Sequence, residues 1–475
     1  MSTHLTRRRF LQSTAAGAAG YWLTATAASA VRAADAGSKV RIACIGVGGK
    51  GGSDTDDAGQ VGQVVALCDI DENTLNGKAG KFADAKKFTD FRKLFDDMAK
   101  EFDAVTVSTP DHTHAPAAIM AMRSGKHVYC QKPLTHTVYE ARQMREVAKK
   151  AGVCTQMGNQ GSAHNMLRRG VEVVQAGIIG PVREAHVWTN RPIWPQAPGI
   201  TKRPAESPVP EGVHWDEWLG PAPVRPYSGP SESASTQRRG RAGRTPRGAY
   251  HDFNWRGWWD FGTGALGDMA CHTANLAHRA LKLGYPVSVV ADATDLNTET
   301  YPSSAHVTFE FPARSDMPAV TFNWYEGKRN GKRVLPDEVL KKVLEPGQSA
   351  PASASILVGD KGILYSPQEN GHEWILIGEG LEEAAKKVPQ TLPRNHKGDT
   401  GMKQEWVEAI KAGKPDHAYS NFDIAGMLTE TILLGNIAIK LNGQKLAWDG
   451  PSLQFTNNSA ATGLLHYEYR KGWTL

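Results

Sequence analysis

The chain has 475 residues, which is enough for two or more domains and a large buried core. Hydrophobic residues make up 40% of it and charged residues 22%, as in soluble globular proteins rather than disordered or fibrous ones. The formal net charge is +6, but four of the positive charges lie in an N-terminal segment that we expect to be removed. The remaining +2 gives no indication of nucleic-acid binding.

The N-terminal segment has the pattern of a twin-arginine export signal. Residues 6–12 contain three consecutive arginines, and a weakly apolar stretch rich in Ala and Gly follows over residues 13–27. Small-residue cleavage patterns end at Ala30 and at Ala33. We therefore predict that residues 1–33 are a signal peptide read by the twin-arginine export machinery, and that the mature protein is periplasmic or otherwise exported. A membrane anchor is the alternative, but the stretch is short for a span, and no later stretch is predicted to cross a membrane.

The first predicted strand, residues 40–45, leads into a turn in which three glycines fit G-x-G-x-x-G. A second predicted strand, residues 63–68, ends in Asp69, 23 residues after the first glycine, a spacing typical of dinucleotide-binding units. Such glycines let the backbone approach a pyrophosphate, helix N-terminal amides bind its charge, and the acid accepts hydrogen bonds from the ribose. An ordinary glycine-rich turn is the alternative, and the order of strand, glycines and acid argues against it. The residues predicted to bind the dinucleotide here are Gly46, Val47, Gly48, Gly49, Lys50, Gly51, Asp69 and Ile70.

Two further expectations concern this unit. Asp69 is followed by Ile70 and Asp71, and no Arg or Lys stands nearby to accept a 2′-phosphate, so the sequence favours NAD over NADP. Residues 51–54 are weak helix formers, so the first helix is expected to be short.

Strand and helix patterns then alternate, which predicts a doubly wound parallel sheet, a Rossmann domain, over residues 38–158. In such a sheet the loops after the strands open at the carboxyl edge, where ligands bind. The predicted helices are residues 73–83, 91–100, 116–124 and 135–151, and the further strands are residues 103–108, 127–130 and 153–157.

Residues 159–475 are predicted to form a second, α+β domain with a mainly antiparallel sheet, so the fold class is α/β with two unlike domains. Residues 191–255, rich in Pro, Gly, Ser and Arg, read as a long functional loop. Five arginines between residues 238 and 247 indicate a solvated loop, with contact to an anion or a neighbouring subunit as the alternative. The predicted helices are residues 165–175, 266–283, 404–411 and 423–441, and the strands are residues 182–189, 287–293, 304–311, 319–324, 354–358 and 362–365.

Asp268 and His272 lie four residues apart in the helix predicted from Leu266 to Leu283, so they share one face. The helix dipole favours the anion of Asp268 in the first turn, and a histidine there can exchange a proton near neutral pH. On spacing alone, an i,i+4 surface pair is the better explanation of the two residues. The aromatic- and Gly-rich lead-in before them suits a sugar, whose C–H faces stack on flat rings, although core packing is the alternative.

Three motifs together resemble the Gfo/Idh/MocA oxidoreductases, the family of glucose–fructose oxidoreductase and inositol dehydrogenase. They are the glycine turn, Thr109-Pro110 with His114, and Gln131-Lys132-Pro133. The family's usual tripeptide is Glu-Lys-Pro, so Gln131 removes one charge beside the cofactor and leaves the lysine. The resemblance implies that Lys132 lies beside the nicotinamide and a substrate hydroxyl, where a cation stabilises a developing alkoxide, and that the peptide bond after it is cis.

The resemblance also implies the remaining site residues and an assembly. Gly-Asp-x-x-x-His resembles the family's catalytic pair, and relatives often pair through the sheet of the second domain, which implies a homo-oligomer. The implied catalytic residues are Lys132, Asp268 and His272; the implied cofactor contacts are Thr109, Pro110, His114, Gln131 and Lys132; and the implied substrate contacts are Lys132, Asn159, Trp255, Arg256, Asp268 and His272.

The leading interpretation is an NAD(P)-dependent oxidoreductase that transfers hydride between a nicotinamide and a sugar, polyol or related hydroxyl compound. An NAD-retaining glycosidase that oxidises, eliminates and re-reduces its sugar is a second hypothesis, and a non-enzymatic dinucleotide-binding protein is a third. In the expected mechanism His272 removes the hydroxyl proton, Lys132 stabilises the oxygen, and Asp268 orients or charges the imidazole. Whether Lys132 or His272 is the base stays open. Because an exported enzyme cannot count on free NAD, we expect the cofactor to be tightly bound.

The chain has five cysteines, and no two of them are spaced as C-x-x-C. Small buried thiols are the simplest interpretation, so we predict neither disulfides nor a metal site. The sequence also has no P-loop, zinc pattern or internal repeat. The cysteines are Cys44, Cys68, Cys130, Cys154 and Cys271.

Overall fold

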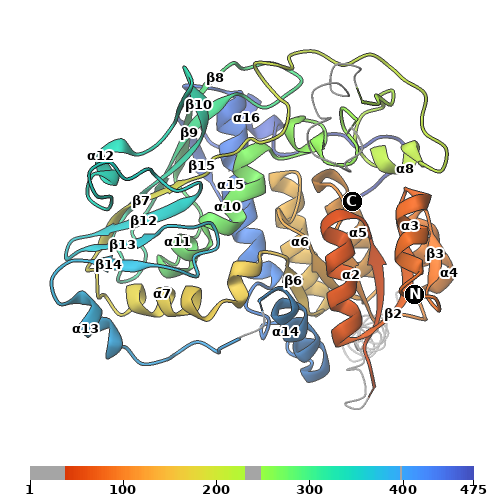
Figure 1. Ribbon diagram of the computed structural model, residues 1–475, viewed down its shortest axis with the longest axis horizontal. Coiled ribbons are helices and arrows are strands. Elements are labelled where there is room, and N and C mark those ends of the chain that lie inside the picture. Colours follow the sequence, from red (N-terminus) through yellow and green to blue (C-terminus); the bar gives the residue numbers. More distant parts are fainter. Residues whose placement is uncertain (1–37, 231–247, 396–397) are drawn as a thin grey trace, which may run out of the picture.

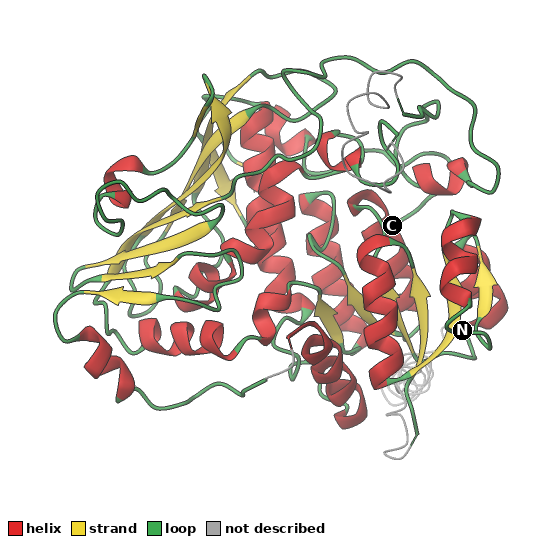
Figure 2. Ribbon diagram, in the orientation of Figure 1, coloured by secondary structure: helices red, strands yellow, loops and turns green. Residues whose placement is uncertain are grey.

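The structure is a computed structural model that describes residues 38–230, 248–395 and 398–475. The predicted signal peptide, residues 1–33, lies outside the described residues, and so do the clustered arginines between residues 238 and 247. Two sheets lie on opposite sides of the molecule, with long helices between them (Figures 1 and 2).

The first sheet is the predicted doubly wound parallel sheet. Its six strands are ordered β3-β2-β1-β4-β5-β6, and all neighbouring strands are parallel. Its central strands are buried at nearly every position, as expected when helices cover both faces. The prediction missed β3, which has three residues and no buried side chain. The strands are β1 Arg41–Ile45, β2 Gln63–Cys68, β3 Lys86–Phe88, β4 Ala104–Val107, β5 His127–Cys130 and β6 Thr155–Met157.

The first helix, α2 Gly49–Val61, is 13 residues long, so the prediction of a short helix was wrong. Gly51 lies so close to the glycine turn that a Cβ atom on it would be 2.1 Å from the carbonyl oxygen of Gly46. Further along, the fully buried Asp54 pairs with Lys403 of α14 Gly398–Ala412. Tertiary contacts therefore supply the stability that the local helix propensity lacks.

The helix after β4 begins at Asp111, earlier than the predicted start at Pro116. Pro110 caps it in an extended conformation, so the polar residues after Pro110 are helical and buried rather than part of a loop. Pro116 is tolerated within the helix, although proline usually marks a first turn. The helices of this domain, besides α2, are α3 Glu72–Ala79, α4 Phe91–Met98, α5 Asp111–Arg123 and α6 Val138–Ala151.

The second sheet has ten strands in the order β14-β13-β12-β7-β10-β9-β8-β15-β16, with β11 paired to β10. Only the pair of β7 and β10 is parallel among its described strands, which confirms the predicted, mainly antiparallel sheet. The strands are β7 Val182–Trp188, β8 Ser288–Thr294, β9 Ser304–Phe311, β10 Val320–Arg329, β11 Lys332–Arg333, β12 Ala354–Gly359, β13 Ile363–Ser366, β14 Ile375–Ile377, β15 Leu446–Asp449 and β16 Gln454–Phe455.

The helix predicted over residues 266–283 is two helices, α10 Gly264–Thr273 and α11 Asn275–Ala280. The Thr273 hydroxyl donates to the carbonyl of Met269 at 3.0 Å, a bond that bends helices. Every residue of α10 is buried, so Asp268 and His272 are not an exposed pair.

The long helix α15 Phe422–Lys440 packs between α6 and strands β8 and β9, so it joins the two domains (Figure 1). By length and composition it could cross a membrane, which the sequence analysis did not foresee, but 83% of its most apolar window is buried inside the protein. The remaining helices are η1 Gln160–Ala163, α7 Asn165–Gln175, α8 Trp215–Leu219, η2 Asn254–Gly257, α12 Asp337–Leu340, α13 Leu381–Lys386 and α16 Ser459–Gly463.

All five cysteines are buried and free, as the composition predicted.

Candidate active site

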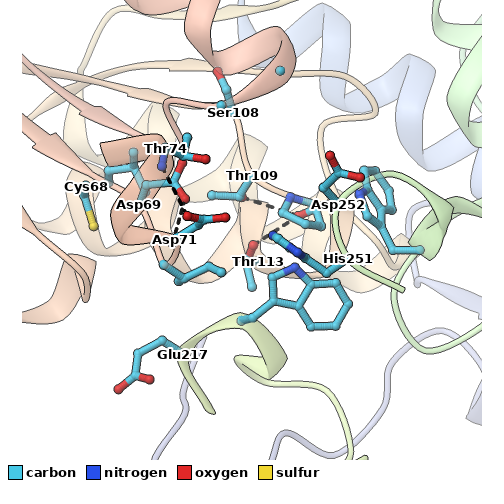
Figure 3. A pocket seen from close by; sticks show the side chains of 18 of the residues that line it. Cys68, Asp69, Asp71, Thr74, Ser108, Thr109, Thr113, Glu217, His251 and Asp252 are labelled. Carbon is cyan, nitrogen blue, oxygen red and sulfur yellow. Dashed lines mark hydrogen bonds between the residues drawn. The ribbon is translucent and has the colours of Figure 1, made fainter. Parts of the chain in front are cut away.

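A cavity of about 510 Å³ opens at the carboxyl edge of the parallel sheet. It runs from the glycine turn past Asp69 and Thr109 to Lys132 and Arg256. In Figure 3, Asp69, Asp71 and Thr74 lie on one side of it, and His251 and Asp252 lie across from them. Its length and position are those of a dinucleotide site in an open α/β sheet. Most of the predicted cofactor residues line it: Gly46, Gly48, Gly49, Lys50, Asp69, Ile70, Thr109, Pro110, Gln131 and Lys132.

The glycine turn is shaped to hold a pyrophosphate. Gly46 has a φ of +77°, and a Cβ atom there would be 2.7 Å from the carbonyl oxygen of Ser108. A Cβ on Gly48 would be 2.8 Å from Cγ2 of Thr74. A side chain at Gly46 or Gly48 would therefore collide with neighbouring protein atoms and crowd the turn that leads to the N-terminus of α2. These residues therefore fit a dinucleotide, because bare backbone amides are what a pyrophosphate needs.

Asp69 is held in place by backbone donors at the end of β2. Its Oδ2 accepts the N–H of Val47 at 2.8 Å, and its Oδ1 accepts the N–H of Asp71 at 3.1 Å. Burial raises the pKa of Asp69, although the two backbone bonds oppose this effect. The carboxylate thus joins the glycine turn to the end of β2 and lines the cavity where the adenosine ribose would lie.

The described parts of the long loop, residues 191–230 and 248–255, lie over this end of the cavity. The N–H of Glu72 donates to the carbonyl of Gly212, and the N–H of His214 donates to that of Ile70, both at 2.9 Å. Six residues of this loop line the cavity. They are Glu217, Trp218, His251, Asp252, Phe253 and Trp255.

At the other end, Lys132, Arg256 and Asp268 meet, although they come from three separate segments. Lys132 Nζ donates to Asp268 Oδ1 at 2.9 Å and to the Asp268 carbonyl at 2.8 Å. Arg256 Nε donates to the same carboxylate oxygen at 3.3 Å. Burial by itself would raise the pKa of Asp268, but Lys132 and Arg256 hold it well below its usual range, so the carboxylate stays ionised. The Lys132–Pro133 peptide bond is cis, as the resemblance implied.

His272 lies one turn beyond Asp268 on α10 and does not itself line the cavity. Its Nδ1 is buried and has no hydrogen-bond partner in the described part of the chain. Burial, reinforced by the nearby charge of Lys132, lowers the pKa of His272 to about 3, so the ring is neutral. We expected Asp268 to orient this imidazole; instead its carboxylate is bonded to Lys132 and Arg256.

Gln131 connects Lys132 to a buried carboxylate that the sequence analysis missed. Its Nε2 donates to Asp54 Oδ2 at 2.8 Å, and its Oε1 accepts the backbone N–H of Lys132 at 3.3 Å. Burial would raise the pKa of Asp54. Lys50 and the fully buried Lys403 lower it, so Asp54 is ionised. A glutamate at position 131 would repel this carboxylate, which accounts for the departure from Glu-Lys-Pro.

Asp111 is a second residue that the sequence analysis missed. It directly follows Pro110, is 3% exposed and lines the cavity near Lys132. Its Oδ2 accepts the hydroxyl of Thr263 at 2.7 Å, and burial raises the pKa of Asp111 to about 7. Its position beside the Thr-Pro motif was the available signal, but only the tertiary structure shows that it faces the cavity.

His114, implied as a cofactor contact, and Asn159, implied as a substrate contact, are instead hydrogen-bonded to other parts of the protein. The His114 ring lies between the carbonyls of Pro133 and Thr109, 2.8 Å from each, and so ties together the turns after β4 and β5. Asn159 is fully buried, donates to the carbonyl of Cys271 at 3.2 Å, and accepts two serine hydroxyls. Neither residue lines the cavity, whereas Trp255 and Arg256 do.

Both domains match family models. Residues 40–159 match the model described as "Oxidoreductase family, NAD-binding Rossmann fold", and residues 235–333 match that of the "GFO/IDH/MocA C-terminal domain". The predicted family resemblance and NAD as the cofactor are thereby confirmed.

Curated relatives match over part of this chain. Inositol 2-dehydrogenase of Salmonella typhimurium is 32% identical over 91 residues, 19% of this chain and 26% of that protein. Myo-inositol 2-dehydrogenase of Thermotoga maritima is 27% identical over 158 residues, 33% of this chain and 47% of that protein. The chain thus spans about a quarter to a half of these relatives' length.

Among solved structures, the WlbA dehydrogenase of Bordetella pertussis, in complex with NADH and UDP-GlcNAcA, superposes with a TM-score of 0.56. The match covers 86% of this chain and 99% of that one at 14% identity, which shows a shared two-domain fold.

Proposed function

We propose a function for this chain as a member of the Gfo/Idh/MocA oxidoreductases, whose models match both of its domains. It is an NAD-dependent enzyme that moves hydride between the cofactor and a hydroxyl-bearing carbon of a sugar or polyol. Inositol dehydrogenases among its relatives support this substrate class. The observation that carries the proposal is Lys132, held by Asp268 at the inner end of a cavity that begins at the glycine turn.

When bound, NAD supplies the chemistry by taking hydride from a substrate carbon or returning it. Lys132 positions the substrate oxygen. Two of the three N–H groups on its Nζ are donated to Asp268, and in the described part of the chain this leaves one for a substrate hydroxyl. As that hydroxyl loses its proton, the ammonium stabilises the negative charge that develops on oxygen. Asp268 keeps the ammonium in place and offsets the cost of burying it.

His272 is the group we assign as proton acceptor. Its ring is neutral and its buried Nδ1 has no partner among the described residues, whereas Lys132 Nζ is already bonded to the Asp268 carboxylate. In this assignment Lys132 stabilises charge and His272 moves the proton. Asn159 helps to fix the position of α10, because its amide donates to the carbonyl of Cys271, the residue before His272.

The loop over the cavity supports retention of the cofactor. Its backbone bonds to Ile70 and Glu72 close the adenosine end, and Trp218 and Phe253 lie along the cavity wall. A cofactor enclosed in this way leaves only after the loop opens, so we propose that NAD stays bound through successive turnovers. The enzyme then works without free NAD, which agrees with export by the twin-arginine route and a periplasmic location.

The test uses the mature chain purified without added nucleotide. Mass spectrometry of the denatured protein is expected to find NAD or NADH at about one per chain. Addition of a polyol such as myo-inositol is expected to change the absorbance of the bound nicotinamide, and addition of a sugar acceptor to reverse it. Protein that is empty and inactive until stoichiometric NAD is added would contradict retention, while a lack of turnover on any sugar or polyol with NAD would contradict the oxidoreductase.

The same preparation distinguishes the proposed oxidoreductase from the alternative, an NAD-retaining glycosidase. An aryl glycoside incubated without added cofactor would release its aglycone with no net change in bound NADH if elimination were the main reaction. We expect no such release, because the two inositol dehydrogenases among the relatives are redox enzymes.

A further inference from the structure

Asp54 is a buried carboxylate in α2 that bonds side chains from several segments of the chain. It is 0% exposed and does not itself line the dinucleotide cavity that the described residues form. Its Oδ2 accepts the side-chain amide of Gln131 at 2.8 Å and the hydroxyl of Ser108 at 2.9 Å. Its Oδ1 accepts Nζ of Lys403 and lies 3.3 Å from Nζ of Lys50. One oxygen therefore meets neutral donors, and the other meets two ammonium groups.

The neutral donors come from the two loops that shape the inner end of the cavity. Ser108 follows β4, Gln131 follows β5, and both residues line the cavity. Asp54 thus ties both loops to α2. Because Lys132 directly follows Gln131, a movement of Gln131 is passed to the backbone from which Lys132 reaches Asp268.

Gln131 is held in one position and one orientation. Its backbone N–H donates to the carbonyl of Val107 at 2.8 Å, and a Cβ atom on Gly158 would be 2.5 Å from its Nε2, so its side chain packs directly on that glycine. Its Nε2 faces Asp54, and its Oε1 accepts the backbone N–H of Lys132 at 3.3 Å. A carboxylate accepts hydrogen bonds and cannot donate them, so the charge on Asp54 decides which way this amide points.

Lys403 requires the negative charge to be at this place. Its side chain is fully buried, and its other contacts among the described residues are Asp57 at 3.4 Å and the ring of Tyr129 at 4.4 Å. Removing the main partner of a buried ion leaves a charge without compensation. The family's usual tripeptide has its carboxylate at position 131, whereas this chain has an amide there and the carboxylate on α2, one hydrogen bond away.

We propose that Asp54 is a positioning residue for Lys132. Its ionised carboxylate, neutralised by Lys403, orients Gln131, and Gln131 in turn fixes the backbone from which Lys132 reaches Asp268. The role of Lys132 in the reaction rests on the proposed function, whereas the position of its ammonium can be measured without a substrate.

The test exchanges the carboxylate and the amide, using two isosteric substitutions in the full mature chain. Gln131→Glu puts a carboxylate oxygen where Nε2 now lies, 2.8 Å from Oδ2 of Asp54, so two anions repel each other. Asp54→Asn sets two amide donors face to face, and Gln131 then relieves this only by turning its Oε1 away from the N–H of Lys132. The double variant has the same total charge as the wild type and the same hydrogen bond with donor and acceptor exchanged.

Single-turnover kinetics at pH 8, with myo-inositol and equal nucleotide content, measure the effect. Each single variant is expected to transfer hydride about 10- to 100-fold more slowly than the wild type, because small displacements of a positioned group have effects of this size. The double variant is expected to recover to within about threefold of the wild type, since the two changes are coupled. A purely structural role would lower the denaturant midpoint of the single variants and leave the turnover of each folded, NAD-loaded molecule unchanged.

Crystal structures of the same variants give a measurement that needs no turnover. The contact between Lys132 Nζ and Asp268 Oδ1, 2.9 Å in the wild type, is expected to exceed hydrogen-bond distance in Gln131→Glu and to return in the double variant. Asp56→Asn is the matched control. Asp56 lies in the same helix and pairs with Lys78 and Lys81 at 3.0 Å, so this variant is expected to behave like the wild type.

The outcomes separate this proposal from the proposed function. Wild-type turnover in both single variants, no recovery in the double variant, or an unchanged contact between Lys132 and Asp268 in Gln131→Glu would each overturn the positioning role. Wild-type protein that turns over no sugar or polyol would contradict the proposed function alone, and the crystal structures would then decide the positioning role. Should Asp54→Asn fold poorly, Gln131→Glu, which keeps the pair of Asp54 and Lys403, provides the test.

Discussion

At one end of the large cavity, Gly46, Gly51 and Asp69 come from a single stretch of chain; at the other, Lys132, Arg256 and Asp268 come from three. The first end is held by backbone bonds within one strand–turn–strand unit. The second exists only because α10 of the second domain brings Asp268 to Lys132, which follows β5 of the first sheet. We therefore expect changes at the first end to alter cofactor affinity, and changes at the second to abolish chemistry without loss of cofactor.

The largest effect is expected for Lys132→Met. Because the cation that stabilises the developing charge on oxygen is lost, turnover should fall by about 10²–10⁴-fold while NAD stays bound. Single-turnover kinetics and the nucleotide content of the purified variant test both parts. Lys150→Met, on the exposed end of α6, is the control and should behave like the wild type. Equal loss of NAD and activity would remove the contrast between the two ends.

Asp268→Asn should affect both activity and stability. It leaves Lys132 and Arg256 facing each other without the carboxylate between them, and breaking a buried ion pair in this way typically costs about 3–5 kcal/mol. The wild-type carboxylate is ionised throughout the neutral range because its pKa is lowered, so the cost should be the same at pH 6 and pH 8. Denaturant unfolding at both pH values measures it, and a cost present at only one of them would contradict the assigned charge state.

Asp111, between the two ends, should give an effect on stability that does depend on pH. Its folded-state pKa of about 7 lies above the ordinary value of 3.8, so the wild type loses stability as pH rises from about 4 to about 7. Asp111→Asn does not titrate and should be more stable than the wild type at pH 8, by up to ~4 kcal/mol, and equally stable at pH 4. Thermal unfolding at the two pH values, with the same nucleotide content, tests this. An equal difference at both would show that folding does not raise the pKa of Asp111.

The smallest effect is expected for Asp69→Asn, at the adenosine end. Loss of a charged acceptor for the ribose hydroxyls should weaken NAD by about tenfold, and NADP should bind as in the wild type or better because its phosphate is no longer repelled. Calorimetry on nucleotide-free protein measures both affinities. Tighter binding of NADP than NAD to the wild type would refute the role of Asp69.

Much of the first domain could be predicted because its signals are local. Strand β2 was predicted at its observed bounds, since apolar runs between glycines and acids identify buried strands directly. The predictions that failed depended on distant contacts. The length of α2 rests on Lys403 from the other end of the chain, and the early start of α5 rests on its burial against the second domain.

The active site, too, could be predicted where its signals are local and not where it depends on distant contacts. Motifs located Lys132, Asp268 and His272, but motif spacing carries no information about which of them bond, and the expected Asp268–His272 contact proved to be Asp268–Lys132. Asp54, Asp111 and Lys403 had no motif at all. Their roles come from burial, which makes an isolated carboxylate costly and therefore requires a partner wherever the chain can supply one.

By itself, then, the sequence determined the strand–glycine–strand unit, the α/β class and the residue types available for chemistry, because these depend on neighbours in the chain. Only the tertiary structure decided which charges pair and that Nδ1 of His272 is left without a partner in the described part of the chain, because those depend on desolvation and on contacts between segments hundreds of residues apart.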